Sequence, residues 1–465
     1  MARFVIRHVH SPENCPARNP HRGAKLLNHL SPRSVAEFGL KVHGEAVVKG
    51  EHTMYLIVEA GDERQLRKFL APFEGAGSVE VYPASTCSGV ITAGGCDMPP
   101  PVTEVLPALD PEVACQDAIE SGLVVRRAHP LNCEASIPAL TGGVVVPNAG
   151  FYVRNHFSVP NLDPENYRLQ LGGLVERPLS LSLPELRAMQ SRSQVITLEC
   201  AGNGRTMFDP PIQGEKWELG AVSTAEWTGV PLAALLERAG VRTEAREVLF
   251  RGADRGMVDG HSEPIRFERS MRLDDGQLAG ALLAYTMNGE PLPVHHGYPL
   301  RLVVPNWYSV ASVKWLTEIE LISQPFTAYY QTEKYWYEWQ RDGGLVREPV
   351  KLQRVRALIT EPASNQEVLR GELTIRGVAW SGAAPIARVE VSVGEGDWQA
   401  ARLEGESQRG SWRRWELITR LDRSGASEMR ARATDQAGHI QPERAEWNSH
   451  GYGNNSIQRI SICAV

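Results

Sequence analysis

The chain has 465 residues, of which 42% are hydrophobic and 22% charged, and its formal net charge is −6 at pH 7. This length exceeds what one hydrophobic core supports and predicts two to four domains, and the composition excludes a disordered chain. The modest negative charge argues against nucleic-acid binding as the main function, because that function needs clustered cations.

The beginning of the chain lacks the features of a secretory signal. Residues 1–8 read MARFVIRH, with no long apolar run, no cleavage site and no twin-arginine pair. No stretch reaches the roughly 20 apolar residues that span a bilayer. The seven cysteines are odd in number and lack the tight spacing of a disulfide framework. We therefore expect a cytoplasmic protein with reduced thiols, no membrane partner and no nucleic-acid partner.

Residues 1–97 predict a small α/β domain. Three segments alternate apolar and polar side chains in the manner of strands: residues 4–9, 55–58 and 79–82. Residues 62–70 have helical spacing behind an acidic first turn, and a second helix runs from Ala24 to Leu30 or on toward Leu40. This order of elements predicts a ferredoxin-like βαββαβ domain, whose role the sequence does not reveal.

Histidines and cysteines recur within this first domain. His8, His10 and Cys15 lie close together in the sequence, as do Cys87 and Cys96. Their spacing matches no specific zinc pattern, which favours packed or solvated side chains over metal ligands. The sequence leaves metal binding by these residues open.

A proline-rich stretch at residues 98–113 predicts a stiff linker. Residues 114–347 then combine segments of helical spacing with segments of strand-like alternation, which predicts an α+β domain. Ser182 and Glu185 form a capping box ahead of one helix. A strand at residues 195–198 leads to Cys200, and a helix from Val230 is closed by Gly240.

The pattern changes after about residue 348. Short segments with period-two alternation follow one another, separated by Gly, Ser and Asp: residues 373–376, 388–393, 412–417 and 429–433. About seven such strands are expected in this region, which is typical of an immunoglobulin-like β-sandwich at residues 348–465. The fold class predicted for the whole chain is α+β with several domains.

The most informative stretch reads LECAGNGR, residues 198–205. A strand delivers Cys200 to its end, small residues follow, and Arg205 comes five positions later. A free thiolate is a soft ligand suited to a soft metal centre, although a buried structural cysteine is the alternative. Four further strings place Arg, Lys, His and Asn in Gly- and Pro-rich loops: residues 151–164, 216–232, 284–301 and 303–315. Together they indicate a site for a phosphate-bearing organic cofactor.

These motifs resemble the sulfite oxidase family of molybdenum-cofactor enzymes. The patterns RNH…VP, CAGN.R, MNG.PLP..HG.P.R and SVKW occur in that order, and the resemblance covers about residues 131–465. It implies a sulfite-oxidase-type catalytic domain that binds Mo-molybdopterin at residues 114–347. It also implies that the immunoglobulin-like domain mediates dimerisation, so that the protein is a homodimer. The form resembled is a bacterial type with an extra N-terminal domain and no haem domain.

The resemblance also assigns roles to single residues. Cys200 is implied as the protein ligand of molybdenum. Contacts to the cofactor are implied at Tyr152, Val153, Arg154, Asn155, His156, Cys200, Asp254, His296, Arg301, Ser312, Val313 and Lys314. A cationic substrate pocket with catalytic residues is implied at Arg154, Arg205, Trp217, Tyr335 and His450.

The chain departs from the family pattern at three of these places. His450 stands where the family has an arginine that completes the substrate pocket, and an imidazole is cationic only below its ordinary pKa of about 6.5. Gly204 replaces a further arginine of many relatives, and Asn306 replaces a usual glycine. Weaker anion binding at neutral pH, or a different substrate, would follow.

The resemblance implies a two-electron oxygen-atom transfer. Oxidation of sulfite or a related small sulfur oxyanion is the expected reaction, with electrons passed to a separate acceptor such as a cytochrome c, because residues 1–97 carry no haem signature. Two alternatives stay open: a reductase of nitrate or another oxo-compound, and a non-catalytic protein that binds the cofactor for regulation.

Overall fold

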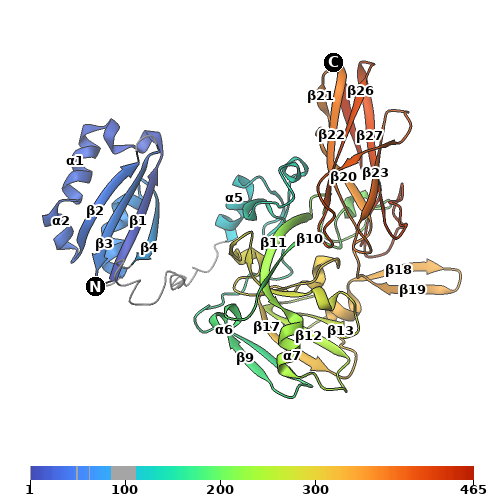
Figure 1. Ribbon diagram of the computed structural model, residues 1–465, viewed down its shortest axis with the longest axis horizontal. Helices are drawn as coiled ribbons and strands as arrows, with labels where there is room; N and C mark the ends of the chain where they lie inside the picture. The colour runs from blue at the N-terminus through green and yellow to red at the C-terminus, as the bar shows by residue number, and fades with distance from the viewer. Residues whose placement is uncertain (1, 49–50, 62, 85–110) are drawn as a thin grey trace. The chain divides into compact units, whose positions relative to one another are not determined.

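The computed structural model describes residues 2–48, 51–61, 63–84 and 111–465, and the chain divides into two compact units, residues 1–104 and 105–465 (Figure 1). Cys87, Cys96 and most of the expected linker, residues 98–110, lie outside the described residues. The second unit is built mostly from β-strands with few helices, whereas the described part of the first unit combines a four-stranded sheet with three α-helices. None of the helices described is long and apolar enough to cross a membrane.

The first unit contains one four-stranded antiparallel sheet in the order β2-β3-β1-β4. Its elements are β1 (Ala2–His10), η1 (Pro12–Asn14), η2 (Pro16–Arg18), α1 (Pro20–His29), α2 (Pro32–Glu37), β2 (Lys41–Val48), β3 (Thr53–Ala60), α3 (Glu63–Glu74) and β4 (Gly77–Ala84). The helices bury apolar residues against the sheet, and Leu56, Val58 and Phe69 are fully buried there.

The predicted strands and the helix after residue 62 are confirmed in this unit. Of the two extents expected for the second helix, the shorter, Ala24 to Leu30, agrees with α1, whereas the extension toward Leu40 is wrong because α1 and α2 are separate helices. Ser31 separates them and caps α2, and Pro32 cannot donate the backbone hydrogen bond that a continuous helix needs. Strand β2 was not predicted from the sequence, because it is a mostly exposed edge strand without a clear apolar alternation.

The second unit begins with the elements that surround the site. They are α5 (Pro111–Glu120), β5 (Val124–Arg127), β6 (Asn132–Glu134), η3 (Ile137–Thr141), η4 (Asn148–Gly150), β7 (Val153–Arg154), β8 (Arg168–Gly173), β9 (Leu179–Ser182), α6 (Leu183–Arg187), β10 (Arg192–Glu199), η5 (Arg205–Met207), β11 (Val222–Pro231), α7 (Leu232–Ala239), β12 (Glu247–Gly256), β13 (Ile265–Arg272), η6 (Leu278–Gly280), β14 (Leu282–Met287), β15 (Glu290–Pro291), η7 (Val294–His296), β16 (Arg301–Val303), η8 (Ser309–Ala311), β17 (Leu316–Ile322), the π-helix η9 (Tyr329–Glu333), β18 (Trp336–Arg341) and β19 (Gly344–Pro349).

Three sheets and a hairpin organise this part. One sheet runs β10-β11-β14-β15, with β16 beside β14, and another runs β13-β12-β17-β8-β9. A small sheet joins β5, β6 and β7, and β18 pairs with β19. The predicted capping box is confirmed at the start of α6, and Gly240 ends α7 in a left-handed conformation, as expected.

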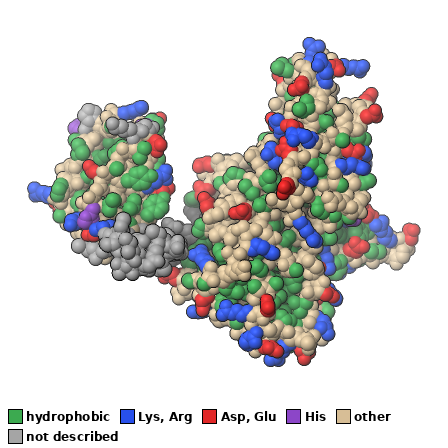
Figure 2. All heavy atoms as spheres, in the orientation of Figure 1, with side chains coloured by type: hydrophobic (Ala, Val, Ile, Leu, Met, Phe, Trp, Pro, Cys, Tyr) green, Lys and Arg blue, Asp and Glu red, His purple; other side chains and the backbone are tan. Residues whose placement is uncertain are grey.

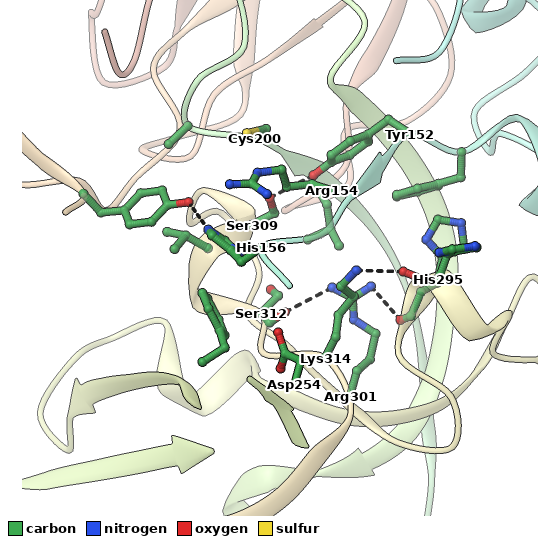
Figure 3. Close-up of a pocket in the computed structure, with 17 residues that line it drawn as sticks. Tyr152, Arg154, His156, Cys200, Asp254, His295, Arg301, Ser309, Ser312 and Lys314 are labelled. Atoms are coloured by element: carbon green, nitrogen blue, oxygen red, sulfur yellow. Dashed lines mark hydrogen bonds between the residues drawn. The ribbon is translucent and has the colours of Figure 1, made fainter. Parts of the chain in front are cut away.

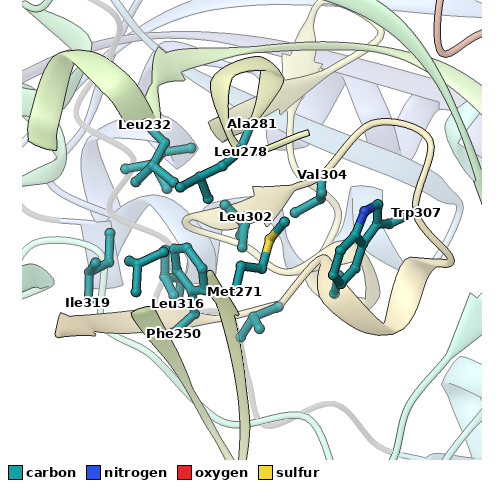
Figure 4. Packing of buried hydrophobic residues seen from close by; sticks show 14 of the residues in the cluster. Leu232, Phe250, Met271, Leu278, Ala281, Leu302, Val304, Trp307, Leu316 and Ile319 are labelled. Atoms are coloured by element: carbon teal, nitrogen blue, oxygen red, sulfur yellow. The ribbon is translucent and has the colours of Figure 1, made fainter. Parts of the chain in front are cut away.

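The largest hydrophobic core lies between these sheets and α7. Figure 4 shows Leu232 of α7, Phe250 of β12 and Ile319 of β17 in this cluster. All three side chains are fully buried. Each such side chain contributes about 1.5–3 kcal/mol through burial, so this core fixes the strands on which the site is built.

The last part of the chain, residues 350–465, is described throughout and contains strands without helices. These are β20 (Arg356–Glu361), β21 (Gln366–Val368), β22 (Gly371–Trp380), β23 (Ile386–Val393), β24 (Gln399–Ala400), β25 (Arg402–Leu403), β26 (Arg413–Leu421), β27 (Gly425–Asp435) and β28 (Arg459–Ala464). They form two sheets, β20-β22-β26-β25 and β21-β28-β27-β23-β24. The four strands expected here are confirmed as parts of β22, β23, β26 and β27. Figure 2 shows acidic and basic side chains intermingled on the face in view.

Candidate functional site

A pocket in the second unit brings together residues from strands and loops that are far apart in the sequence (Figure 3). Ten of the residues expected at the site line it: Tyr152, Arg154, His156, Cys200, Asp254, His296, Arg301, Ser312, Lys314 and Tyr335. Figure 3 shows Cys200 at one end, Asp254, Lys314 and Arg301 at the other, and Arg154 and His156 between them.

The end of strand β10 positions Cys200. The Cys200 backbone N–H donates to the carbonyl of Ala221 at 2.9 Å, and the Cys200 carbonyl accepts from the N–H of Asn203 at 2.9 Å. The turn that follows needs glycine, because a Cβ at Gly202 would lie 2.6 Å from the Arg205 guanidinium. Strand and turn together hold the thiol at the pocket wall, where the side chain is buried.

The C-terminal part of the chain supports this strand from behind. Thr197 donates its N–H to the carbonyl of Gly410 at 2.8 Å and accepts the N–H of Trp412 on Oγ1 at 2.7 Å. The buried carboxylate of Glu199 accepts the indole N–H of Trp380 at 2.9 Å and pairs with Arg356 at 3.4 Å. These contacts fix the two residues of β10 that flank Leu198, just ahead of the cysteine.

Burial raises the pKa of the Cys200 thiol, against the opposing effect of Arg154, of the Gly202 N–H and of Arg205. The thiol is therefore protonated in the free protein near neutral pH. A bound metal cation deprotonates a coordinating thiol outright. This environment suits a metal ligand better than an activated nucleophile, which requires a lowered pKa.

Arg154 supplies a permanent charge beside the thiol. Burial lowers its pKa, but Tyr335, Cys200 and Glu215 more than offset this effect, so that the pKa of Arg154 is raised overall. Its guanidinium donates to the carbonyl of Asn155 and, at 3.5 Å, to Asn132. A guanidinium fixed in this way offers an anion always-charged donors of constant geometry.

Tyr335 and His156 form a hydrogen-bonded pair on the same wall, with 2.6 Å between the phenol oxygen and Nε2. Burial, with Arg154 and Lys314 nearby, holds the pKa of His156 well below its ordinary value, and burial raises the pKa of Tyr335 well above its own. Both groups are therefore neutral at pH 7, and the tautomer of His156 decides which of them donates the hydrogen bond. Tyr335 has a φ of 63°, which is costly for a bulky side chain and rare outside functional sites.

The other end of the pocket combines two cations and a carboxylate. The Arg301 guanidinium donates to the carbonyls of His296 at 2.9 Å and Ser312 at 3.2 Å, and burial lowers its pKa to about 10. The Lys314 ammonium donates to the carbonyl of His295 at 2.8 Å and to the side-chain oxygen of Asn155. Burial, with Arg301 nearby, lowers the pKa of Lys314 well below its ordinary value, and Asp254 acts in the opposite direction, so an anionic ligand would favour the charged form of Lys314.

Asp254 is buried beside Lys314, and its Oδ1 has no hydrogen-bond partner among the residues that the structure describes. Burial raises its pKa to about 7, although Lys314 acts in the opposite direction. A buried acceptor without a partner costs roughly 1–3 kcal/mol. We therefore expect a ligand with hydrogen-bond donors at this position.

His295 also lines the pocket, although no pattern in the sequence separately indicated it. Its Nδ1 lies 3.2 Å from the amide nitrogen of Asn155, and its Nε2 is buried with no partner in the described part of the chain. Burial lowers the pKa of His295 to about 4. The adjacent pair of histidines was the available signal, and only His296 was chosen from it.

Six expected residues do not line the pocket. Val153, Asn155 and Val313 are buried behind its wall, where Asn155 joins Lys314 to His295. The other three lie further away: Arg205, Trp217 and His450. Trp217 is fully buried in the hydrophobic cluster that also contains Cys200.

Arg205 and His450 meet on either side of a tyrosine that the sequence analysis did not identify. The Arg205 guanidinium lies 5.4 Å from the centre of the Tyr452 ring, and the His450 ring stacks on Tyr452 at 5.8 Å. Arg205 also donates to the carbonyl of Glu215 at 2.9 Å. The His450 Nε2 lies 3.2 Å from Glu338, and burial lowers the pKa of His450 against the influence of that carboxylate.

Three family models match the chain. An oxidoreductase molybdopterin binding domain covers residues 156–330, and a Mo-co oxidoreductase dimerisation domain covers residues 348–464. A domain of unknown function, DUF3303, covers residues 13–94. The first two models together cover most of the residues that line the pocket and the C-terminal residues that hold strand β10.

Individual proteins are similar over much of the chain. Mitochondrial sulfite oxidase of Macaca fascicularis is 36% identical over 73% of this chain, which spans 65% of that protein's length. Sulfite oxidase of Arabidopsis thaliana is 32% identical over 73% of this chain and 93% of its own. The crystal structure of the sulfane dehydrogenase SoxCD from Paracoccus pantotrophus matches with a TM-score of 0.64 and 28% identity, over 81% of this chain and 96% of that one.

Proposed function

Because the chain belongs to the sulfite oxidase family of molybdopterin-dependent oxidoreductases, we propose that it oxidises sulfite or a related small sulfur oxyanion. In this reaction sulfite and water give sulfate, two protons and two electrons, and the electrons pass to a separate acceptor. The observation that carries the proposal is the single pocket in which the Cys200 thiol, the Arg154 cation and the buried group of Asp254, Lys314 and Arg301 meet (Figure 3).

The residues of the pocket fit a Mo-molybdopterin cofactor. The pterin N–H groups are donors of the kind that Asp254 Oδ1 lacks, and the phosphate is an anion of the kind that Lys314 and Arg301 attract. The unpartnered Nε2 of His295 offers a further hydrogen bond. Asn155 and Ser312 would position these groups through the contacts described above.

Cys200 would hold the molybdenum through Sγ, since thiolate sulfur is the softest donor that proteins provide. When bound, the cofactor supplies the two-electron oxygen-atom transfer itself. The protein would contribute the fixed charge, the exclusion of water and the placing of the substrate.

Arg154 would bind the substrate anion beside the thiol, because its charge persists at every physiological pH. The neutral pair of Tyr335 and His156 shares one hydrogen bond between the phenol oxygen and Nε2, and this bond would hold the Tyr335 phenol in place beside the substrate. We propose that Arg205, Trp217 and His450 act from behind this wall, by orienting Tyr452 and the Cys200 turn.

The remaining parts of the chain have proposed roles as well. The strand order β2-β3-β1-β4, with helices between β1 and β2 and between β3 and β4, supports a ferredoxin-like first domain. The two packed sheets of residues 348–465 support an immunoglobulin-like domain. The match to a dimerisation domain there supports a homodimer. A cytochrome c as electron acceptor and a cytoplasmic location complete the proposal.

The direct test is a steady-state assay of the full-length, molybdenum-loaded protein with sulfite as donor and ferricyanide as acceptor. We expect turnover with the unchanged chain and a fall to the background rate for Cys200→Ser, because an alcohol is a poor ligand for this metal. Cys463→Ser removes an exposed thiol and is the matched control, with unchanged turnover.

Three results would contradict the proposal. The first is substantial turnover of sulfite by Cys200→Ser with normal folding. The second is reduction of nitrate by a reduced donor dye in place of sulfite oxidation. The third is full molybdenum content without turnover of either substrate, which would indicate a non-catalytic, regulatory protein.

A further inference from the structure

The first unit brings three potential metal ligands together at one end of its sheet. His10 is the last residue of β1, Cys15 lies between η1 and η2, and His52 directly precedes β3. One ligand atom from each, the cysteine sulfur and a ring nitrogen of each histidine, lies within 4.8 Å of the other two. The backbone N–H of His10 donates to the carbonyl of His52 at 3.2 Å, so two of the three positions are fixed to each other.

The histidines at this place have unused ring nitrogens. Both ring nitrogens of His10 are buried and have no hydrogen-bond partner in the described part of the chain, and the same holds for Nδ1 of His8. His8 is only 4% exposed, and its ring stacks on that of His10 at 5.2 Å. Buried polar atoms are nearly always satisfied, so several orphaned nitrogens in one place indicate a missing partner.

The cluster lies on the wall of a cavity of about 750 Å³. Much of the cavity wall is apolar and includes Leu26, Met54 and Phe73. Because the cavity adjoins the three residues, a metal bound to them would have one side facing open space rather than packed side chains.

We propose that His10, Cys15 and His52 bind one transition metal ion of the zinc and copper class, with a fourth coordination position that opens into this cavity. A thiolate with two imidazoles is a donor set that selects these ions over hard cations such as Mg²⁺ and Ca²⁺. Three protein ligands with one open position are typical of centres that bind an exchangeable molecule.

The three ligand atoms need to approach one another only slightly to bind a metal ion. Ligand atoms around a tetrahedral zinc ion lie about 3.3–3.8 Å apart, as follows from bond lengths of about 2.0–2.3 Å. The 4.8 Å limit found here is about 1 Å wider. Cys15 is partly exposed in a loop between two short 3-10 turns, where a rotation of its side chain can shorten these distances.

This proposal is independent of the molybdenum site, and its test removes that site's thiol. The full-length chain with Cys200→Ser is stripped of metal and titrated with Co²⁺, whose visible spectrum reports thiolate and tetrahedral coordination. We expect one equivalent to bind with a sulfur-to-metal absorption band. Cys15→Ser should abolish that band, and both Cys15→Ser and His52→Gln should weaken binding at least tenfold.

Two controls keep the result specific. His21→Gln changes an exposed histidine of the same unit, and Cys463→Ser changes an exposed thiol, so both should bind Co²⁺ as the parent does. A parent chain that shows no sulfur-to-metal band would overturn the proposal. So would equal binding by the parent, Cys15→Ser and His52→Gln variants.

Two further measurements address the identity of the ion and the open position. Elemental analysis after growth with added zinc or copper should find one equivalent of either ion in the parent and none in Cys15→Ser. Retention of neither ion by the parent would contradict the assignment of metal class. Azide should shift the Co²⁺ spectrum by entering the fourth position, and an unchanged spectrum would contradict an open site.

Discussion

His450 stands where the family resemblance implies an arginine, and its immediate neighbour explains what that replacement does. Its imidazole lies 3.2 Å from Glu338 and has a lowered pKa because of burial, so it adds no positive charge near neutral pH. The substrate anion must therefore rely on Arg154 and, from behind the wall, Arg205.

We predict that His450→Arg lowers the KM for sulfite at pH 7, because it adds a permanent cation to this side of the site. The decrease should be small, about twofold, since Glu338 would pair with the new guanidinium. The double variant His450→Arg with Glu338→Gln should lower KM further, by roughly the tenfold that corresponds to about 1.4 kcal/mol. Steady-state kinetics check both values, and an unchanged KM in the double variant would contradict this account of anion binding.

His295 makes a prediction about pH. Its pKa is about 4 in the folded chain and about 6.5 when unfolded, so between these values the unfolded state binds more protons. The free energy of unfolding therefore decreases as pH falls below 6.5, by at most about 3 kcal/mol near pH 4 for this one residue. We expect His295→Gln to reduce the loss of thermal stability between pH 7 and pH 5 in cofactor-free protein.

The measurement is calorimetric unfolding of the second unit at several pH values. A steeper loss of stability in His295→Gln than in the parent would show that His295 is not held neutral by its surroundings.

For single residues, the sequence predicted which side chains form the site better than it predicted which side chains contact them. The motif residues are mostly at the pocket because each motif follows a strand end or fills a tight loop, as Cys200 and Lys314 do. The partners of those residues come from elsewhere in the chain. Glu338 beside His450, and His52 beside His10, are neighbours only through folding, and no local pattern predicts them.

Strand β10 is the element on which the site most depends. It ends at Glu199, just before Cys200, and the Glu199 carboxylate is held by Arg356 of β20 and Trp380 of β22. The side chains of Glu199 and Arg356 are 2% and 1% exposed. A charge so deeply buried is tolerated only with its partner.

We predict that Arg356→Met destabilises the second unit by about 3–5 kcal/mol, because it leaves the Glu199 carboxylate unpaired. Replacing both residues, with Glu199→Gln and Arg356→Met, should recover much of that loss. Urea unfolding gives these values. Arg420→Met, which removes an exposed ion pair with Asp422, should cost less than about 1 kcal/mol. A double variant no more stable than Arg356→Met alone would contradict the buried-charge explanation.

The elements themselves were predictable where burial imposes a strict period. Helix α7 has the helical spacing of a partly buried element and was expected, as was strand β10, whose last four residues are all buried. Strand β2 and the many 3-10 turns around the pocket were not, because exposed edges and single turns leave no periodic pattern. Most of the second unit is sheet, and the two helices expected there exist as α6 and α7.

At the scale of the whole chain, the two units have separate hydrophobic cores. We predict that a chain beginning at Val105 folds and keeps its rate of sulfite oxidation with ferricyanide within about twofold, because the cores of the second unit begin at Ala114 among the described residues. Calorimetry of the full chain should show two transitions, of which the truncated chain retains one. Loss of cofactor binding on truncation would contradict this independence.

The support of strand β10 has a consequence for how the protein is made. Thr197 is held by Gly410 and Trp412, and Glu199 by Trp380, so residues near position 200 depend on partners synthesised about two hundred positions later. While the ribosome is still adding those residues, the sulfur of Cys200 has no rigid backing. The cofactor must therefore be inserted after translation has passed Trp412, into a chain that is nearly complete.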